Sequence, residues 1–233
     1  MDLERIAKLN TIIIPAWREE KGLAVVLTKV FQMIDDTYEV IVVDDGSDDA
    51  SAQVASQFPC RVIRHELNRG KGEALKTGIR QARGENIIWI DADDTYPVEL
   101  IPQIVEGLVS HDMVVCSRKF GRENIPCLNR IGSLVFRHAI RTIYGFMPYD
   151  PFSGLCGVKK RYLEMMNLSS QRFAIEPEIS IKGSRMKLKM VDIPIEYQAR
   201  VGDTKLNWVK VGFEDLWTIL RLIHWRPTKG RNG

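Results

Sequence analysis

Short apolar runs alternate with longer helical patterns through the first half of the chain. The runs, such as TIIIPA and YEVIVVDDG, are rich in β-branched residues, which is typical of strands. Strands that are apolar along their whole length need cover on both faces. The pattern therefore predicts an α/β fold with a mostly parallel central sheet and helices on both faces. Strands are expected at 11–16, 38–46, 60–66, 85–93 and 112–119, and helices at 19–34, 50–58, 70–83 and 97–109.

The second half has a different pattern, with more basic residues. It contains no linker, repeat or low-complexity segment, so we expect a single domain. The last helix is amphipathic, and we weigh two positions for it: in a membrane interface, or packed on the domain core. The expected elements are helices at 130–145, 161–168, within 172–186 and at 208–227, a strand at 152–160, and a strand pair or long edge strand at 187–200.

Composition narrows the class of protein. The chain has 233 residues, 45% of them hydrophobic and 27% charged, which is ordinary for a soluble globular protein. A net charge of +3 is too small to indicate nucleic-acid binding, and no basic stripe with interleaved aromatic residues is present. The N-terminal segment MDLERIAKLN is charged, and no run approaches the roughly 18 apolar residues of a spanning helix. We expect a cytoplasmic protein without a transmembrane segment, peripheral on a membrane at most.

Acidic residues gather where two of the predicted strands end. Asp44 and Asp45 end the strand at 38–46, and Asp91 and Asp93 end the strand at 85–93. Ligands of open α/β sheets bind beyond the carboxyl ends of the strands, so these side chains should share one crevice. An Asp-x-Asp pair supplies hard oxygen ligands for Mg²⁺ or Mn²⁺, and such an ion can hold a diphosphate. The alternative is that the aspartates cap the following helices, and for Asp94 we favour capping.

A glycine-rich segment, NRGKGEAL, opens the predicted helix at 70–83. Gly70 and Gly72 would let the backbone approach a ligand closely, and free amides at a helix start favour anions. The segment lacks the spacing of a Walker motif or a dinucleotide fingerprint. A tight turn is an equally good reading, and Lys71 is either a phosphate contact or a solvated side chain.

Taken together, these motifs resemble a known family. IIIPAWREE, YEVIVVDDGSDD, NRGKGEALKTGI and IIWIDADDTYP occur in the order and spacing of the family 2 glycosyltransferases with a GT-A fold, which use nucleotide-diphosphate sugars. Within that family the chain is similar to the dolichyl-phosphate mannose synthase and dolichyl-phosphate glucosyltransferase group. The later segments CSRKFG, FSGLCGVKK, RFAIEPEI and RVGDTKLNW extend the resemblance from Thr11 to about Arg221.

The resemblance implies a role for each matching residue. It implies a donor half at about 10–117, an acceptor half at 118–206 and an amphipathic helix at 207–227. Where the group usually has Gln after the acidic pair, this chain has Thr95, which leaves the third metal ligand open. The implied nucleotide-sugar site consists of Pro15, Glu19, Asp44, Asp45, Lys71, Asp91, Ala92 and Asp93; the metal ligands are Asp91 and Asp93; the acceptor phosphate contacts Arg118, Arg130, Arg200 and Lys205; and the catalytic residues are Asp93, Arg118 and Arg200.

These roles imply an inverting transfer of a hexose from GDP-mannose or UDP-glucose to a polyprenyl phosphate. A phosphate acceptor is already an anion at neutral pH and needs no strong base, whereas a sugar hydroxyl acceptor would need a carboxylate. Glu176 and Glu178 are the candidates for that carboxylate, unless they stabilise the start of the helix that follows them.

Two other classes of protein remain as alternatives. A nucleotide-sugar-forming nucleotidyltransferase would carry its glycine-rich signature after the first strand, where this chain has PAWREEKGL. A non-catalytic sugar-binding module would not need Asp91, Asp93, Arg118 and Arg200 together. We therefore favour the transferase.

Overall fold

The first strand shows why the chain folds in layers. All seven residues of β1 (Asn10–Ala16) are buried. Ile12 and Ile14 pack into one hydrophobic core, and Ile13 packs into another on the opposite face. A strand with two apolar faces belongs in the interior of a sheet that is covered on both sides.

The computed structural model describes residues 10–124, 127–145, 148–201 and 208–227. In this part of the chain seven strands form one sheet in the order β3-β2-β1-β4-β6-β5-β7. All of them run in the same direction except β6, which is antiparallel to both β4 and β5. The predicted mostly parallel sheet is confirmed. The strands after β1 are β2 (Tyr38–Asp44), β3 (Arg61–Arg64), β4 (Asn86–Trp89), β5 (Met113–Phe120), β6 (Cys156–Lys159) and β7 (Met190–Glu196).

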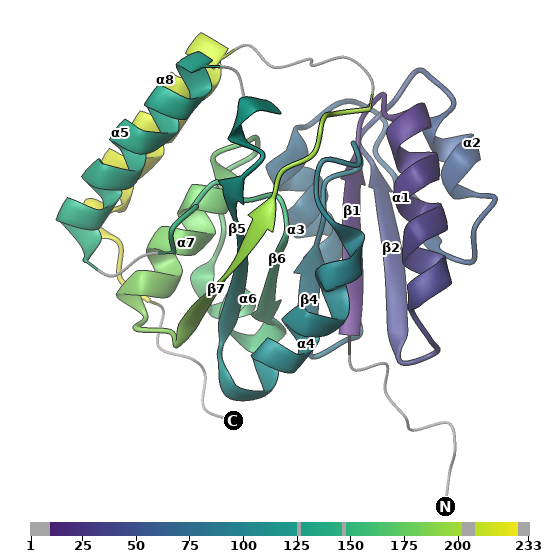
Figure 1. The fold of residues 1–233 in the computed structure, drawn as a ribbon, viewed down its shortest axis with the longest axis horizontal. Helices are drawn as coiled ribbons and strands as arrows, with labels where there is room; N and C mark the ends of the chain where they lie inside the picture. The colour runs from purple at the N-terminus through teal and green to yellow at the C-terminus, as the bar shows by residue number, and fades with distance from the viewer. Residues whose placement is uncertain (1–9, 125–126, 146–147, 202–207, 228–233) are drawn as a thin grey trace, which may run out of the picture.

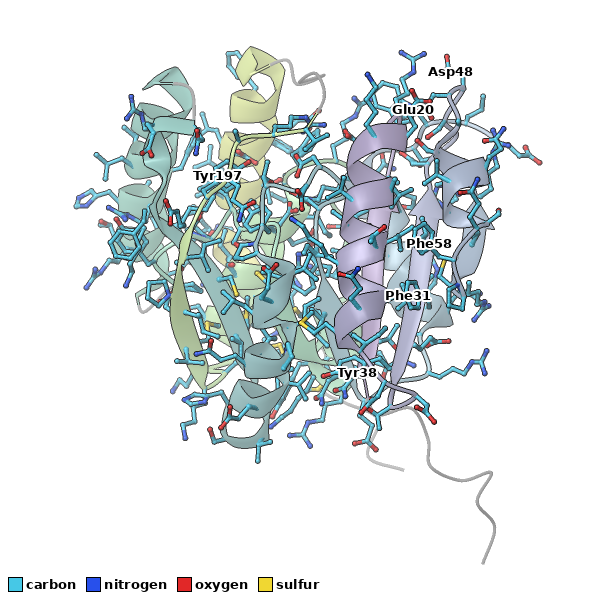
Figure 2. The ribbon with its side chains drawn as sticks, turned by 45° about the vertical axis from the view of Figure 1, so that its right-hand side comes forward. Glu20, Phe31, Tyr38, Asp48, Phe58 and Tyr197 are labelled. Carbon is cyan, nitrogen blue, oxygen red and sulfur yellow. The ribbon has the colours of Figure 1, made fainter. Side chains whose placement is uncertain are left out.

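Helices cover both faces of this sheet, as predicted (Figure 1). The core on one face includes residues of α1 (Glu20–Met33), α2 (Ser51–Ala55) and α4 (Ile101–Ser110). Phe31 of α1 stacks on Phe58 just after α2, with ring centroids 5.9 Å apart (Figure 2). The core on the other face includes residues of α3 (Lys71–Gln81), α6 (Lys160–Met166) and α7 (Ile175–Arg185).

Two further helices, α5 (Cys127–Tyr144) and α8 (Trp208–Arg221), lie side by side at one end of the molecule (Figure 1). Ile140 of α5, Ile181 of α7 and Ile219 of α8 form a third, smaller core. The predicted amphipathic helix at the end of the chain is therefore α8, followed by a 3₁₀ turn (Leu222–His224). None of the described helices is long and apolar enough to cross a membrane.

Several elements are shorter than the apolar runs that predicted them. The strand expected at 85–93 is β4, which ends at Trp89, and Asp94 then takes a left-handed conformation with φ of +59° that is incompatible with a strand. The strand expected at 152–160 is β6, and the segment at 187–200 forms the single edge strand β7. After Pro97 the chain makes a 3₁₀ turn (Val98–Leu100) before α4 begins.

Candidate active site

Most of the predicted site residues lie at the carboxyl ends of the strands, which form the upper edge of the sheet in Figure 1. Asp44 is the last residue of β2, and Asp45 follows it. Asp91 and Asp93 lie in the turn after β4, on the other side of β1. Arg118, near the end of β5, approaches from the second half of the chain. Both acidic pairs and Arg118 therefore lie along the same edge of the sheet.

Lys71 lies between two carboxylates. Its Nζ is 2.5 Å from Asp91 Oδ1, and it forms a second ion pair with Glu176 at the start of α7. Burial alone would lower the pKa of Lys71, but the two carboxylates raise it above its ordinary value and keep the amine charged. Burial also raises the pKa of Asp91 and of Glu176, against the opposing effect of Lys71.

Asp93 is held by a hydroxyl on one oxygen and a guanidinium on the other. The hydroxyl of Thr95 donates to Asp93 Oδ1 at 2.6 Å, and Arg200 Nη1 donates to Oδ2 at 2.6 Å. Arg200 also pairs with Glu19, just before α1. The backbone N–H of Val201 donates to the carbonyl of Asp93 at 3.0 Å, which fixes the segment after β7 over the acidic turn. Thr95 stands at the position where the third metal ligand was left undecided, and in this structure its hydroxyl orients the Asp93 carboxylate.

Arg118 is anchored by Asp150. Its Nε and Nη2 donate to the two carboxylate oxygens at 2.5 and 2.9 Å, and its guanidinium lies 5.3 Å from the ring centroid of Tyr197. Burial would lower the pKa of Arg118, but Asp150 raises it well above its usual value, and Arg118 in turn lowers the pKa of Asp150. Tyr96 packs edge-on against Tyr197 and its hydroxyl accepts the N–H of Gly154 at 2.7 Å.

Gly154 touches Asp91 directly. A Cβ at this position would lie 2.2 Å from Asp91 Oδ2, a distance that real side chains do not adopt. The loop before β6 therefore needs glycine here so that the Asp91 carboxylate can keep its orientation.

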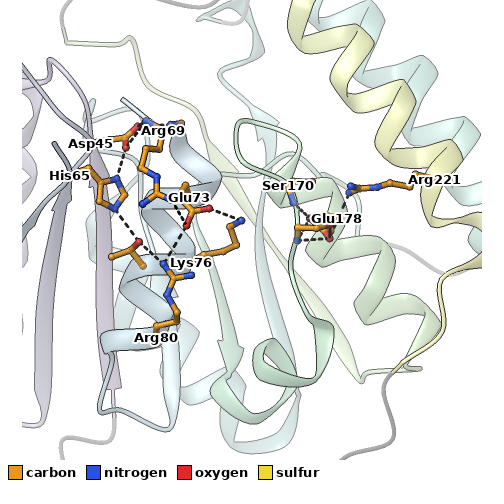
Figure 3. A network of polar contacts seen from close by, with 12 residues as sticks. Asp45, His65, Arg69, Glu73, Lys76, Arg80, Ser170, Glu178 and Arg221 are labelled. Atoms are coloured by element: carbon orange, nitrogen blue, oxygen red, sulfur yellow. Dashed lines mark hydrogen bonds and ion pairs between the residues drawn. The ribbon is translucent and has the colours of Figure 1, made fainter. Parts of the chain in front are cut away.

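The second acidic pair, at the end of β2, has a different environment. Asp44 is fully buried, pairs with Arg64 at 3.1 Å and accepts the N–H of Ser47. Asp45 accepts the backbone N–H groups of Arg69 and Gly70 at 3.0 and 2.7 Å, and His65 at 2.6 Å (Figure 3). The geometry of Asp45 is that of a residue that holds the loop before α3.

Gly70 and Gly72 serve the packing of the chain on itself, which favours the tight-turn reading of this segment. Cβ atoms there would lie 2.5 Å from Gln171 O and 2.6 Å from Ser170 O. The N–H of Glu73 donates to Gln171 O at 3.0 Å, so at least one amide at the start of α3 is already satisfied by the protein. The glycines bring α3 against the loop before α7, and Lys71 reaches Glu176 as a result.

Capping of the following helix was expected of Asp94, and the structure corrects this expectation. Asp94 forms an ion pair with Lys29 of α1 at 2.6 Å, and the 3₁₀ turn after Pro97 has no side-chain cap. Glu178, one of the two candidate bases, already has partners in the chain. It forms an ion pair with Lys182 at 2.5 Å, and it accepts the N–H of Ser170 at 2.7 Å (Figure 3).

The remaining predicted residues lie around this centre or outside the described part of the chain. Pro15 and Ala92 are buried, in β1 and in the acidic turn. Arg130 is half-buried in α5, and no ion pair among the described residues joins it to the aspartates. Lys205 falls outside the described residues.

Sequence reasoning missed four residues of this neighbourhood: Asp150, Tyr96, Tyr197 and Asp215. Tyr96, in the IDADDTYP segment, carried the only local signal, because it follows the acidic motif closely. Asp215 of α8 is 5% exposed, and burial and the nearby charge of Glu176 raise its pKa to about 8. Its Oδ1 has no hydrogen-bond partner among the described residues.

The donor set fits a divalent cation that is shared with a substrate. Among the described residues no group of three or more His, Cys, Asp and Glu side chains could hold a metal ion. Mg²⁺ and Mn²⁺ accept hard oxygen donors, and Mg²⁺ is commonly bound through one or two carboxylates, with water and substrate phosphate completing its shell. Asp91, which is partly exposed, and Asp93, which is buried close to it in the same turn, match that two-carboxylate pattern.

Comparison with known proteins gives the family. The family model described as glycosyl transferase family 2 matches residues 11–154. The chain is 32% identical over 229 residues to a dolichol-phosphate mannosyltransferase of Pyrococcus furiosus, covering 92% of this chain and 64% of that protein. It is 27% identical to a dolichyl-phosphate hexose transferase of Haloferax volcanii, covering 84% of this chain and 86% of that protein. The chain thus spans less than two thirds of the first relative and most of the second.

A solved structure agrees on the fold. Glucosyl-3-phosphoglycerate synthase of Mycobacterium tuberculosis superposes with a TM-score of 0.76 at 18% identity, covering 98% of this chain and 86% of that one. Another structure of that enzyme, with a TM-score of 0.72 at 21% identity over 94% of this chain and 80% of that one, contains Mn²⁺ and uridine diphosphate. The fold is GT-A-like, and the chain belongs to glycosyltransferase family 2.

Proposed function

We propose that this protein transfers a hexose from a nucleotide-diphosphate sugar to a polyprenyl phosphate, with inversion at the anomeric carbon. The observation that carries the proposal is the convergence of three basic side chains, Lys71, Arg118 and Arg200, on the edge that holds Asp91 and Asp93. A reaction between a diphosphate and a phosphate brings several negative charges together, and a site rich in arginine and lysine balances them.

Asp91 and Asp93 would hold Mg²⁺ or Mn²⁺, which neutralises the charge of the departing diphosphate. Support comes from the position of both carboxylates in the turn after β4 and from the Mn²⁺ and uridine diphosphate in the structural neighbour. Glu19, Pro15 and Asp44, at the strand ends beside them, would line the nucleoside pocket. Asp45 would act there by positioning the loop before α3, which carries Lys71.

The acceptor is an anion that needs no base. One of its phosphate oxygens forms the new bond to the anomeric carbon as the bond from that carbon to the diphosphate oxygen breaks. Glu178 forms an ion pair with Lys182, away from the acidic turn, and Glu176 forms one with Lys71, so each candidate base already has a cationic partner. Arg118, held rigidly by Asp150, would orient the acceptor phosphate, with Arg200 between donor and acceptor.

We also propose that the acceptor half, at 118–206, receives its lipid from a membrane surface through α5 and α8. These helices pack together, and each exposes large apolar side chains to solvent. Arg130, Arg137 and Arg221 on the same helices would attract anionic head groups, as Lys205 would. The exposed apolar residues are Leu134, Val135 and Ile143 on α5, and Phe213, Leu216, Trp217 and Leu220 on α8.

The test is the destination of labelled sugar. Supplied with GDP-mannose or UDP-glucose, Mn²⁺ and a polyprenyl phosphate, the protein should move radiolabel into material that partitions into organic solvent. Label that appears only in a water-soluble glycan would show a hydroxyl acceptor instead. Binding of nucleotide sugar without transfer to any acceptor would revive the non-catalytic module.

A further inference from the structure

The amine of Lys71 is enclosed by groups from three parts of the chain. Its Nζ lies 2.5 Å from Asp91 Oδ1, forms an ion pair with Glu176, and lies 6.0 Å from the ring centroid of Phe173. Only 13% of the side chain is exposed. A buried lysine paired with two carboxylates remains charged, so this position holds a permanent positive charge beside one of the proposed metal ligands.

The backbone under Lys71 is fixed. Lys71 is the first residue of α3, and Asp45 holds the residue before it by accepting the N–H of Gly70 at 2.7 Å. Two residues further on, the N–H of Glu73 is bonded to Gln171. With both flanks anchored, the side chain can change partners by rotation alone, and both of its carboxylates lie within reach of the same amine.

We propose that Lys71 is an internal counter-ion of Asp91, which competes with the divalent cation for this carboxylate and pairs with Glu176 alone when the cation binds. The inference rests on the metal site of the proposed function. An ammonium group 2.5 Å from Asp91 Oδ1 neutralises the carboxylate that a metal ion would need, so the two cations would compete for it. Glu176 is then the carboxylate that balances the charge of Lys71 after the cation has displaced the amine from Asp91.

Asp93 is arranged in the same way. Its Oδ2 is paired with Arg200, whose second partner is Glu19. Each proposed metal ligand therefore has a cation of the chain that is shared with another carboxylate. A divalent cation alone must displace both of them, whereas a nucleoside diphosphate supplies phosphate oxygens for the metal and for the displaced side chains. Metal and nucleotide should consequently bind with strong positive coupling.

The competition between Lys71 and the cation is tested by measuring Mn²⁺ binding directly, by calorimetry or by electron paramagnetic resonance. The measurement is made once without nucleotide and once with UDP or GDP, and no sugar is present. Lys71→Met should bind Mn²⁺ alone about tenfold or more tightly than the wild type, because Asp91 and Glu176 lose their counter-ion. The coupling between Mn²⁺ and the nucleotide should shrink accordingly. Lys76→Met is the matched control, since Lys76 lies on the same helix and pairs with Glu73 at 2.8 Å (Figure 3), and its Mn²⁺ affinity should equal that of the wild type.

Glu176→Gln should move the affinity in the opposite direction. With its second partner neutral, Lys71 stays on Asp91, and Mn²⁺ alone should bind about tenfold more weakly. This variant keeps the test decisive if Lys71→Met fails to fold, which circular dichroism would reveal. Mn²⁺ affinities of Lys71→Met and Glu176→Gln equal to that of the wild type would overturn the role of Lys71 while leaving the metal site intact. A wild-type protein that binds no Mn²⁺ even with nucleotide would instead overturn the proposed function, and this inference with it.

Discussion

Arg118 illustrates how single residues set the character of this site. The side chain is largely buried and makes two short hydrogen bonds to Asp150, so its position is fixed before any ligand arrives. A buried charge that has lost its partner is far more costly than a well-paired one. The pair is therefore needed for stability as well as for the orientation of Arg118.

Asp150→Asn should lower the free energy of unfolding by about 3 kcal/mol, because it leaves the largely buried Arg118 without a counter-charge. Denaturant titration of both proteins measures the difference. Asp48→Asn is the control, since Asp48 pairs with Arg18 on the exposed surface (Figure 2) and its loss should change stability little. Equal effects of the two substitutions would contradict the importance of the buried pair.

Gly154→Ala should lower transfer about 10- to 100-fold, because the added methyl group collides with Asp91 and displaces a proposed metal ligand. Steady-state transfer at saturating Mn²⁺ is the measurement. Gly132→Ala in α5, where a Cβ meets nothing within 4 Å, should leave the rate unchanged. Full activity of the Gly154 variant would show that Asp91 is not constrained by this contact.

At the scale of residues, the sequence revealed what is continuous along the chain and missed what folding brings together. Asp91 and Asp93 were predicted because they form one short motif at a strand end. Asp150 is 32 residues from Arg118, and no local pattern marks it as a partner. The glycines at 70 and 72 show the same limit: the sequence left a ligand loop and a tight turn equally open, and folding brings these glycines against the backbone of Ser170 and Gln171.

Among the elements, α8 has two unlike faces. One packs on the domain through Ile219, with Asp215 and Thr218 buried beside it. The other exposes Phe213 and Trp217, which are 70% and 67% exposed. The expected packing on the core is confirmed for one face of the helix. A place in a membrane interface stays a prediction for the other, exposed apolar face.

Stability should depend on pH through Asp215, whose pKa of about 8 in the folded protein lies far above its unfolded value of 3.8. Between these values the folded state retains a proton that the unfolded state releases, so the residue destabilises the fold increasingly as pH rises and fully above about pH 8. Asp215→Asn removes this effect. Its stability relative to the wild type should rise by roughly 2 kcal/mol or more between pH 5 and pH 8.

Denaturant titrations of both proteins at pH 5 and at pH 8 provide the measurement. A difference between variant and wild type that is the same at both pH values would show that Asp215 ionises normally. It would also mean that α8 leaves this carboxylate accessible to water.

Binding to vesicles should depend on the exposed face of α8. Replacing Phe213 and Trp217 together by serine should weaken partitioning onto anionic lipid vesicles about tenfold, because apolar area and aromatic anchors at the interface are lost. Co-sedimentation with vesicles is the measurement. Leu67→Ser is the control, since Leu67 is equally exposed but lies in the loop before α3. Unchanged partitioning of the double variant would exclude this face as the contact.

Element types were predictable and element ends were less so. Short apolar runs marked each strand of the described sheet and longer amphipathic stretches marked the described α-helices, because runs and stretches differ clearly in length and pattern. The end of β4 was placed four residues late, since the apolar run continues through Ile90 while the backbone turns at Asp94. The antiparallel direction of β6 was not anticipated, because direction depends on the path of the connecting loops.

Across the whole molecule, one sheet carries both proposed halves. The boundary proposed near residue 117 falls inside β5, which lies in the same sheet as β1 and β4. Donor and acceptor groups therefore share one rigid support, and Arg200 bridges them by contacting Asp93 and Glu19. This arrangement could be foreseen only in outline, because the family resemblance supplies the fold but not the contacts between side chains.

The most direct measurement is the affinity for UDP or GDP with and without Mn²⁺, in the wild type and in Asp93→Asn. If Asp91 and Asp93 hold a cation that binds the donor diphosphate, Mn²⁺ should tighten nucleotide binding about tenfold or more in the wild type and hardly at all in the variant. Circular dichroism checks that the variant is folded. The same Mn²⁺ enhancement in both proteins, or none in either, would contradict the account.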